Sequence, residues 1–436
     1  MQNRIARLVV MTGLLSSLAA AQEPSTPWRN DPLFQRLAAA LDQVPAIDTH
    51  THLLRAGKFN PALATVGPLL NRSTHPWFPS VLKSRFGITV DAADWSRGIE
   101  AIATARAAMV MRLGEHGYWM NHLDYTQTEI ALVNSNSREL IDDKRLRWVP
   151  HATTLLYPLR ADHLMSRSPS HHADIVAAQK DLQRFMKEAD VTAIPPDLAA
   201  YLRFIDDTLR RWQKQGAVAV KFYDAYLRTL RIADVPEARA SVLYANGTTS
   251  PLARDEYLAL QDFLWRHILL QAGKIALPVH IHSSLGVPPF LRSLESDARN
   301  LEDVLADPAF FATPIVLIHG GGPWIDIAAY LALKPNVWVD ISSIGFLYPV
   351  PDFADMLRKY LLFAPEKVLY GTDAASYPSV PGGADVQHVM LSRATRDALY
   401  LALAGLVRDG VIDQERAIEM GRGVLRENAR RLYGWK

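Results

Sequence analysis

The sequence predicts an α/β protein, a (β/α)8 barrel in which parallel strands alternate with helices. Eight short apolar runs recur along the 436 residues, separated by segments of helical periodicity. Most runs are almost continuously apolar, which is typical of parallel strands covered on both faces. A doubly wound open sheet is the alternative. It is disfavoured because no GxGxxG motif follows a strand, and the Gly320–Gly322 run follows a histidine instead.

The composition restricts the chemistry that the chain can perform. Hydrophobic residues make up 49% and charged residues 21%, as in ordinary globular proteins. There are no cysteines, which excludes disulfides, zinc–thiolate sites and thiol catalysis. Any bound metal must therefore be held by nitrogen and oxygen ligands.

The first 21 residues resemble an export signal. Arg4 and Arg7 precede a mostly apolar run at 8–18, and Ala19, Ala20 and Ala21 offer a cleavage site before Gln22. We therefore expect a signal peptide at 1–21 and a periplasmic or secreted protein. Cleavage would remove two of the 47 basic residues and none of the 45 acidic ones, leaving a neutral chain. Neutrality gives no support to a nucleic-acid or membrane-surface partner, and no later apolar stretch is long enough to span a bilayer. The expected partner is a small-molecule substrate.

The elements follow in order after a polar segment. Residues 22–45 form the mature N-terminal segment and a lead-in helix, because Asp31 and Pro32 are typical of a helix start and Leu33, Leu37 and Leu41 continue at helical spacing. The barrel domain then occupies 46–436. Its strands are predicted at 45–47, 130–133, 146–149, 217–220, 275–281, 315–318, 337–339 and 368–370.

Two insertions interrupt the alternation. Residues 57–96, rich in Pro, Gly and aromatic residues, follow the first strand as a lid, a substrate wall or surface decoration. A long helix is expected at 95–119. Residues 161–215 read as a helical excursion between strands three and four, and helices are expected at 387–408 and 414–432.

Polar residues suited to chemistry lie where the apolar runs end. His50 and His52 are two positions apart, so they point to the same side of the first strand and can chelate a metal. The later members of this set, in chain order, are Lys221, His280, His282, His319, Asp340 and Asp373. The carboxyl ends of barrel strands meet at one mouth, so these side chains should meet there. Unpaired buried charges are costly, and a compensating ion is expected.

Seven motifs in this order resemble the amidohydrolase superfamily and, within it, the amidohydrolase-related (amidohydrolase-2) branch. The matching segments are IDTHTHL at 47–53, KFYDAYLR at 221–228, HIHSSLG at 280–286, LIHGGGPWI at 317–325, NVWVDISS at 336–343, YGTDA at 370–374 and ENARRLYG at 427–434. The resemblance runs from about residue 46 to 434. It implies a metal-dependent enzyme in a distorted (β/α)8 barrel.

The resemblance also implies roles for single residues. His50, His52 and His282 match metal ligands, with His280 as the second choice on strand five. Asp373 matches the aspartate that binds metal and shuttles the proton, and His319 matches either a second-metal ligand or a catalytic base or polariser.

Lys221 matches a lysine that is carboxylated and bridges two metals in hydantoinases and dihydroorotases. The alternative is an ammonium paired with a carboxylate of the site or of the substrate.

Other positions have weaker roles. Asp48 is expected to orient strand-one backbone or a ligand. Asp340 is expected either to fix a histidine tautomer beyond the ligands or to cap a loop. Candidate substrate contacts, with packing as the alternative for each, are Tyr226, Arg228 and His151. His122 and His388 match no strand end and are expected to be structural.

The predicted function is hydrolysis of a C–N bond, in an amide or cyclic amide, by attack of metal-bound hydroxide. Asp373, His319 and Lys221 are the catalytic candidates. One or two zinc ions suit the ligand types, and Mn, Fe or Ni are possible. One alternative is a metal-dependent decarboxylase of a small aromatic carboxylic acid on the same barrel. The other is an exported protein that binds metal or ligand without catalysis.

Overall fold

The computed structural model describes residues 26–53, 78–89, 95–161, 169–286, 291–376 and 382–435. The predicted signal peptide and most of the insertion at 57–96 lie outside these residues. Within the described part of the chain, no helix combines the length and the apolar character needed to cross a membrane.

In the described ranges, eight parallel strands form two hydrogen-bonded ladders, in the orders β1–β2–β3 and β4–β5–β6–β7–β8. Isolated parallel bridges continue the ladder at both seams. Trp148 and Ala217 make one between β3 and β4, and His52 and Ala375 make one between the ends of β1 and β8. The α/β barrel class is therefore confirmed. The strands are β1 (Ala46–Thr51), β2 (Thr128–Asn134), β3 (Leu146–Val149), β4 (Val220–Phe222), β5 (Val279–His282), β6 (Ile315–Ile318), β7 (Val337–Asp340) and β8 (Val368–Leu369).

Only the strands predicted at 146–149 and 315–318 have the predicted bounds, and two others begin three or four residues later than predicted. The run predicted at 217–220 pairs as β4 only from Val220, so Lys221 lies within the strand rather than after it. The run predicted at 275–281 begins its strand at Val279, because Ile275 caps the end of helix α7 (Arg254–Lys274) and Ala276 takes a left-handed backbone (φ 53°). Apolar character alone does not separate the end of a buried helix from a buried strand.

The predicted lead-in helix is α1 (Pro32–Leu41). Asp31 caps it by accepting a hydrogen bond from Leu33 N at 2.8 Å, with proline at the first helical turn. Leu37 and Leu41 are fully buried, so this helix packs onto the barrel just before β1.

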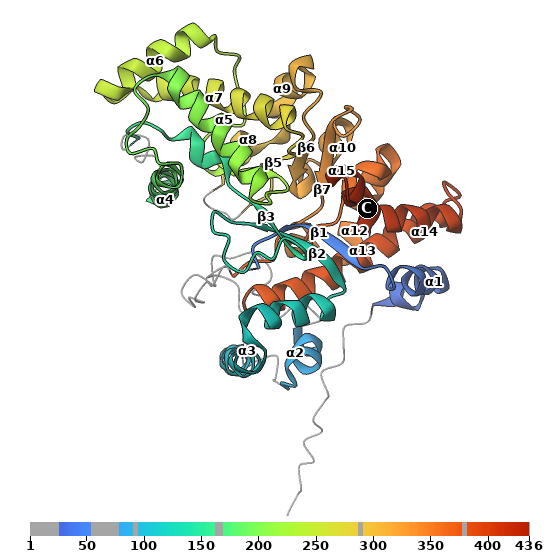
Figure 1. The fold of residues 1–436 in the computed structure, drawn as a ribbon. Coiled ribbons are helices and arrows are strands. Elements are labelled where there is room, and N and C mark those ends of the chain that lie inside the picture. The colour runs from blue at the N-terminus through green and yellow to red at the C-terminus, as the bar shows by residue number, and fades with distance from the viewer. Residues whose placement is uncertain are drawn as a thin grey trace, which may run out of the picture.

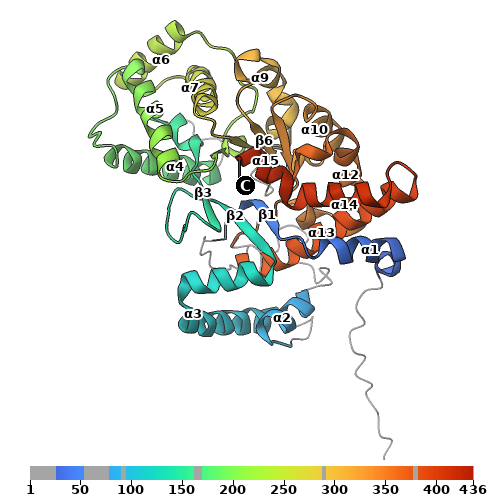
Figure 2. The ribbon, with the colours of Figure 1, turned by 45° about the vertical axis from the view of Figure 1, so that its right-hand side comes forward.

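The remaining helices surround the strands. The long helix after β1 is confirmed but is broken at Gly114, and the helical excursion between strands three and four consists of α4 and α5. Figures 1 and 2 show α4 to α7 grouped on one side of the strands, and α2 and α3 on another. Their bounds are α2 (Phe78–Phe86), α3 (Trp95–Tyr125), α4 (Pro169–Lys187), α5 (Leu198–Lys214), α6 (Glu237–Thr249), α7 (Arg254–Lys274), α8 (Ser293–Ser296), α9 (Glu302–Ala306), α10 (Ile325–Leu331), α11 (Ile344–Leu347), α12 (Val350–Phe363), α13 (Ala384–Arg408), α14 (Gln414–Arg422) and α15 (Asn428–Tyr433).

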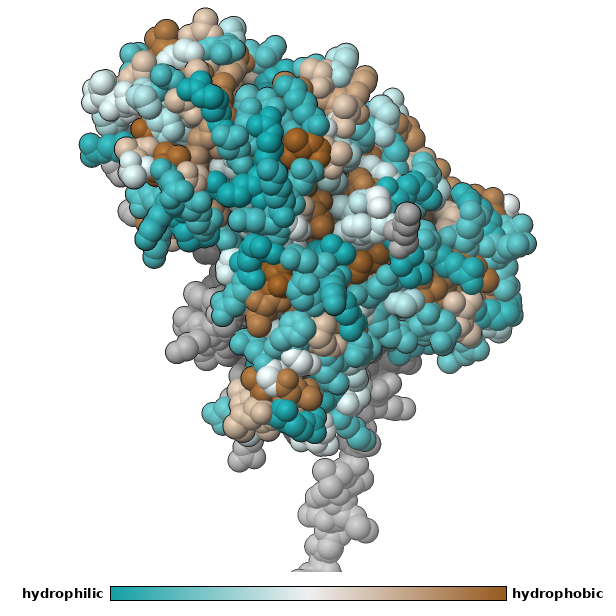
Figure 3. All heavy atoms as spheres, viewed as in Figure 1, coloured by the Kyte–Doolittle hydropathy of each residue, from teal (hydrophilic) through white to brown (hydrophobic). Residues whose placement is uncertain are grey.

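An apolar cluster fills the inside of the barrel. It combines side chains from five strands, the residue before β4 and α15, namely Ile47, Ile130, Leu132, Val149, Ala219, Val316, Ile318, Leu369 and Ala429. Asn428 donates hydrogen bonds to the carbonyls of Pro365 and Val368, at the start of β8. The C-terminal helix therefore closes the amino end of the barrel, and the opposite end remains for the strand-end polar residues. The outer face seen in Figure 3 is mostly hydrophilic, with apolar side chains in small separate groups.

Candidate metal centre

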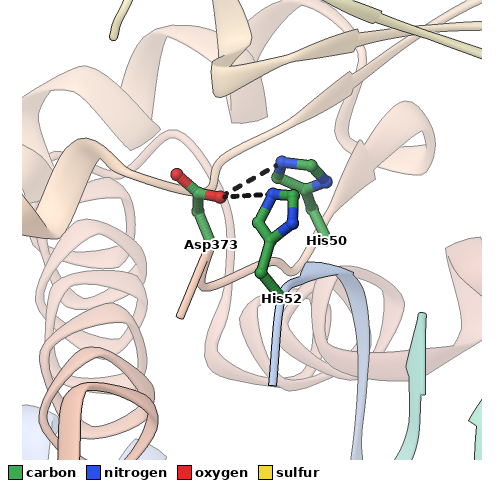
Figure 4. Close-up of side chains that lie close together, drawn as sticks. All are labelled: His50, His52 and Asp373. Carbon is green, nitrogen blue, oxygen red and sulfur yellow. Dashed lines mark ion pairs between the residues drawn. The ribbon is translucent and has the colours of Figure 1, made fainter. Parts of the chain in front are cut away.

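Three predicted ligands meet at the carboxyl end of the strands. Asp373 Oδ1 lies 3.2 Å from His50 Nε2 and 3.4 Å from His52 Nε2 (Figure 4). The three ligand atoms all lie within 4.8 Å of one another. The seam between β1 and the end of β8 brings them together, because Asp373 N donates to His50 O at 2.7 Å and His52 N donates to Ala374 O at 2.8 Å.

This donor set fits a divalent metal. Zinc bound to nitrogen and oxygen at 2.0–2.2 Å in tetrahedral geometry separates its ligand atoms by about 3.4 Å. The contacts between Asp373 and the two imidazoles lie close to this spacing. Two imidazoles and one carboxylate also leave a coordination position open, as catalytic sites require.

Asn134, at the end of β2, contacts both histidines of the HxH pair. Its backbone carbonyl lies 3.1 Å from His52 Nδ1, which places the ring proton on Nδ1 and the lone pair on Nε2. Its side-chain amide lies 2.8 Å from His50 Nδ1. The atom that faces Nδ1 is Nδ2, which also donates to Thr51 O at 3.3 Å, while Asn134 Oδ1 is buried without a partner among the described residues. Flipping the amide would place Oδ1 against a protonated Nδ1 and give up the contact with Thr51 O. The sequence prediction missed Asn134, although it is a polar residue at the end of an apolar strand, the same signal as the other candidates.

Ser343 orients the carboxylate of Asp373. Its hydroxyl donates to Asp373 Oδ2 at 2.6 Å, which leaves Oδ1 for His50 and His52. Ser343 lies in the quoted NVWVDISS motif, but nothing in the sequence singled it out.

Four non-glycine residues at this rim have a left-handed backbone. Ser284, His319, Ser343 and Asp373 follow β5, β6, β7 and β8, with φ of 65°, 68°, 63° and 60°. Such a backbone costs about 1–2 kcal/mol per residue and persists where surrounding structure enforces it, as at functional sites.

Lys221 reaches the same group from β4. Its Nζ lies 3.3 Å from His50 Nε2, and the side chain is buried. Burial lowers the pKa of Lys221 to about 7, although the charges of Asp373 and Asp340 oppose this shift. The amine is therefore substantially neutral near neutral pH, which disfavours a permanent ammonium at this position.

His282 and His319 form a second pair beside the first group. His319 Nε2 lies 3.2 Å from His282 Nδ1, and the rings of His50 and His319 lie 5.4 Å apart. His319 Nδ1 lies 3.0 Å from Ser342 Oγ, and that hydroxyl donates to Asp340. A carboxylate only accepts, so each hydrogen bond of this series has a fixed direction. His282 Nδ1 donates to His319 Nε2, and His319 Nδ1 donates to Ser342 Oγ.

This direction makes His282 a ligand candidate. Its Nε2 carries the lone pair, is buried and has no partner among the described residues. Asp340 contacts His319 through Ser342 Oγ and also accepts from Ser342 N at 3.0 Å, so it makes the contacts of both predicted roles, behind a histidine and in a loop cap. It also accepts from Thr49 Oγ1 at 2.6 Å. Ser342 is a further residue that the sequence did not single out.

Burial keeps these imidazoles neutral, which metal ligation requires. Burial, followed by the charges of Lys221 and His319, lowers the pKa of His50 well below its usual value. Burial lowers the pKa of His319 to about 4 even though Asp373 opposes the shift. Burial, followed by the neighbouring His319, also lowers the pKa of His282 well below normal.

The other sequence candidates lie in different places. The ring of Tyr226 packs 4.5 Å from that of His282, at the edge of the site. The His151 ring packs 5.1 Å from that of Tyr223, and His151 makes a backbone bridge with Lys221.

Two candidates, Arg228 and His280, form hydrogen bonds with residues other than the candidate ligands. Arg228 is buried, with its guanidinium on Asp262 and the carbonyls of Thr229 and Leu258, so the structure gives its predicted substrate contact no support. His280 lies one layer deeper, with Nε2 2.7 Å from Tyr433 Oη.

A family model described as amidohydrolase matches residues 189–435. The chain belongs to the amidohydrolase family. This family implies a divalent metal, which agrees with the three-ligand group. A comparison with curated proteins finds no match.

Solved structures share the fold over most of the chain. One is a candidate metal-dependent hydrolase from Lactobacillus casei, with a TM-score of 0.63 and 18% identity, covering 91% of this chain and 97% of that one. Uronate isomerase from Thermotoga maritima has a TM-score of 0.60 and 13% identity, with coverages of 92% and 97%. Glucuronate isomerase from Caulobacter crescentus has a TM-score of 0.60 and 13% identity, with coverages of 93% and 95%. At these identities the likeness concerns the fold alone.

Proposed function

We propose that this member of the amidohydrolase family is a zinc-dependent hydrolase that cleaves the C–N bond of an amide or cyclic amide. One observation carries the proposal. Asp373 presents one carboxylate oxygen to both imidazoles of the HxH pair, while Ser343 holds the other. A carboxylate whose two oxygens have these separate contacts can bind a metal and also transfer a proton.

The residues that would hold the metal are His50, His52 and Asp373, with the buried lone pair of His282 as the next candidate. A bound divalent metal supplies Lewis acidity, lowering the pKa of water and polarising a carbonyl.

Asp373 is the proposed proton carrier. It takes the proton of the attacking water and returns it to the leaving nitrogen, as general base and then general acid. Ser343 suits both protonation states of Asp373, because a hydroxyl donates to an ionised carboxylate and accepts from a protonated one. His319, neutral and held by Ser342, maintains the orientation of His282.

Lys221 is the proposed site of carboxylation. Its neutral amine would add to CO2, forming a carbamate and releasing one proton. The product is an anionic oxygen ligand beside His50 and would support a two-metal centre. The lowered pKa of Lys221 favours this reaction, since only the neutral amine is nucleophilic.

A decarboxylase of a small aromatic acid is the second candidate, and one observation favours it. Among the described residues, a single group of three side chains gathers its ligand atoms within 4.8 Å. One such group suits one metal better than two. A one-metal centre in which His319 binds no metal is compatible with decarboxylation.

Elemental analysis combined with an activity panel tests the proposal. We expect stoichiometric zinc, a 44-Da mass increase at Lys221 in native mass spectrometry, and turnover of amides or cyclic amides. His50→Ala should lose metal and keep its circular dichroism. His267→Ala, which removes a histidine–aspartate pair between α7 and α5, should keep both.

Two outcomes would overturn the hydrolase proposal. One metal per chain with CO2 release from an aromatic acid would establish the decarboxylase. Stoichiometric metal without turnover of amides, lactones or aromatic acids would establish a binding protein instead.

Export is a separate proposal, based on the sequence of residues 1–21. The mature protein in a periplasmic or culture fraction should begin at Gln22 by mass spectrometry. A chain that keeps Met1 in the cytoplasm would contradict this.

A further inference from the structure

Two histidines that match no strand end form a buried chain towards the candidate metal centre. His122 Nε2, on α3, lies 2.9 Å from His388 Nδ1, on α13. His388 Nε2 lies 3.1 Å from Asp48 Oδ2, on β1. All three side chains are fully buried. Helix α3 therefore reaches the metal-binding strand through α13.

The carboxylate of Asp48 joins the two strand ends that carry the metal ligands. Its Oδ1 accepts from His50 N at 3.2 Å and from Thr372 N at 3.1 Å. Its Oδ2 accepts from Thr372 Oγ1 at 2.6 Å and from His388 Nε2. Thr372 directly precedes Asp373. The carboxylate of Asp48 is therefore bonded to the backbone at His50 and to the backbone next to Asp373, the ligands from opposite ends of the chain.

The hydrogen bonds of this chain have a defined direction. A carboxylate only accepts, so His388 carries its proton on Nε2 and accepts through Nδ1. His122 therefore donates from Nε2. Burial, followed by the neighbouring His388, lowers the pKa of His122 well below its usual value, which agrees with a neutral ring.

A second polar link fixes the same two helices. Asp385, one turn before His388 on α13, accepts hydrogen bonds from Arg106 and Tyr118 on α3. Tyr118 lies one turn before His122. Because α3 and α13 are joined at two successive turns, the position of the His388 ring is well determined.

We propose that His388, supported by His122, is a positioning residue for the metal centre: it holds Asp48, which keeps His50 and Asp373 facing each other. Neither histidine belongs to the group of ligand atoms formed by His50, His52 and Asp373. This inference rests on the proposed metal centre, and it makes helix α3 part of the support for that centre.

Titration with Co²⁺ tests the inference without any substrate, because Co²⁺ absorption reports the coordination geometry. His388→Leu removes the donor to Asp48 and should weaken Co²⁺ binding by about 10- to 100-fold, the usual effect of losing a partner behind the ligands, with an altered absorption spectrum. His388→Gln keeps an N–H donor in place of Nε2 and should recover most of the affinity. His267→Leu, which removes a partly exposed histidine–aspartate pair between α7 and α5, should bind Co²⁺ like the wild type.

A second variant keeps the inference testable if His388→Leu does not fold. His122→Phe leaves the contact between His388 and Asp48 and removes one neutral hydrogen bond behind it, so Co²⁺ affinity should fall by about threefold. Unchanged affinity and spectrum in folded His388→Leu, or in His122→Phe where the former does not fold, would overturn the inference. If the wild type itself binds no Co²⁺, the metal centre has failed instead.

Discussion

The two ends of the barrel share the same strands but bury different kinds of side chain. At the amino end, apolar side chains such as Ile130, Val316 and Leu369 pack together under α15. At the carboxyl end, a similar depth of burial contains imidazoles, the amine of Lys221 and carboxylates. Apolar burial stabilises the fold by about 25 cal/mol per Å², whereas buried ionisable groups cost free energy unless a partner compensates them.

Left-handed backbone occurs at both ends, but at the amino end it falls on exposed or half-buried residues, such as Ala276 before β5. The left-handed residues Ser284, His319, Ser343 and Asp373 all follow strands at the carboxyl end. The strained backbone of these four residues and the buried polar groups lower the stability of the fold at this rim, and they hold the metal-ligand candidates in fixed positions. Removing a buried charge or backbone strain at the carboxyl end should therefore raise the free energy of unfolding, whereas removing apolar side chains at the amino end should lower it.

The largest effect on stability is expected at the amino end. Ile130→Ala should lower the free energy of unfolding by about 2–5 kcal/mol, because it leaves a cavity in the apolar cluster. Denaturant titration measures this change. Co²⁺ affinity and spectrum should be unchanged in the folded variant, and an altered spectrum would mean that the two ends are not separable.

Lys221→Met should instead stabilise the metal-free protein, most strongly at low pH. Burial lowers the pKa of Lys221 to about 7, against about 10.4 in an unfolded chain. Between these values the unfolded chain binds more protons, so the cost of burying Lys221 is complete below pH 7 and disappears as the pH approaches 10. The stability difference between variant and wild type should accordingly be larger at pH 6 than at pH 9.

Unfolding of both proteins in a metal chelator at these two pH values measures this difference. Lys359→Met replaces an exposed lysine paired with Asp326 and should show no such pH dependence. A Lys221→Met protein less stable than the wild type at pH 6 would contradict the contrast between the two ends.

The smallest effect is expected from relieving strain. Ser284 has φ of 65°, and its buried hydroxyl has no partner among the described residues. Ser284→Gly should raise the free energy of unfolding by up to about 1 kcal/mol, after the entropy cost of glycine is subtracted. Its neighbour Ser283, whose hydroxyl donates to Ile318 O at 3.0 Å, is the matched control. Ser283→Gly should lower the free energy of unfolding. If both variants changed the free energy of unfolding in the same direction, strain would not be what distinguishes Ser284.

The sequence by itself determined the barrel, the lead-in helix and most metal-ligand candidates. Apolar runs specify buried parallel strands, and the strand ends of a barrel converge, so His50, His52 and Asp373 could be expected together across more than 300 residues. The absence of cysteine restricted the ligands to nitrogen and oxygen.

Only the tertiary structure decided which residues hold these ligands in place. Asn134, Ser342 and Ser343 resemble many other polar residues in the sequence, and His122 and His388 lie on helices, where no strand-end rule applies. Their importance comes from hydrogen bonds such as that of His388 with Asp48, between residues 340 positions apart. Side-chain direction at that separation depends on how α3, α13 and β1 pack, and no local pattern in the sequence encodes it.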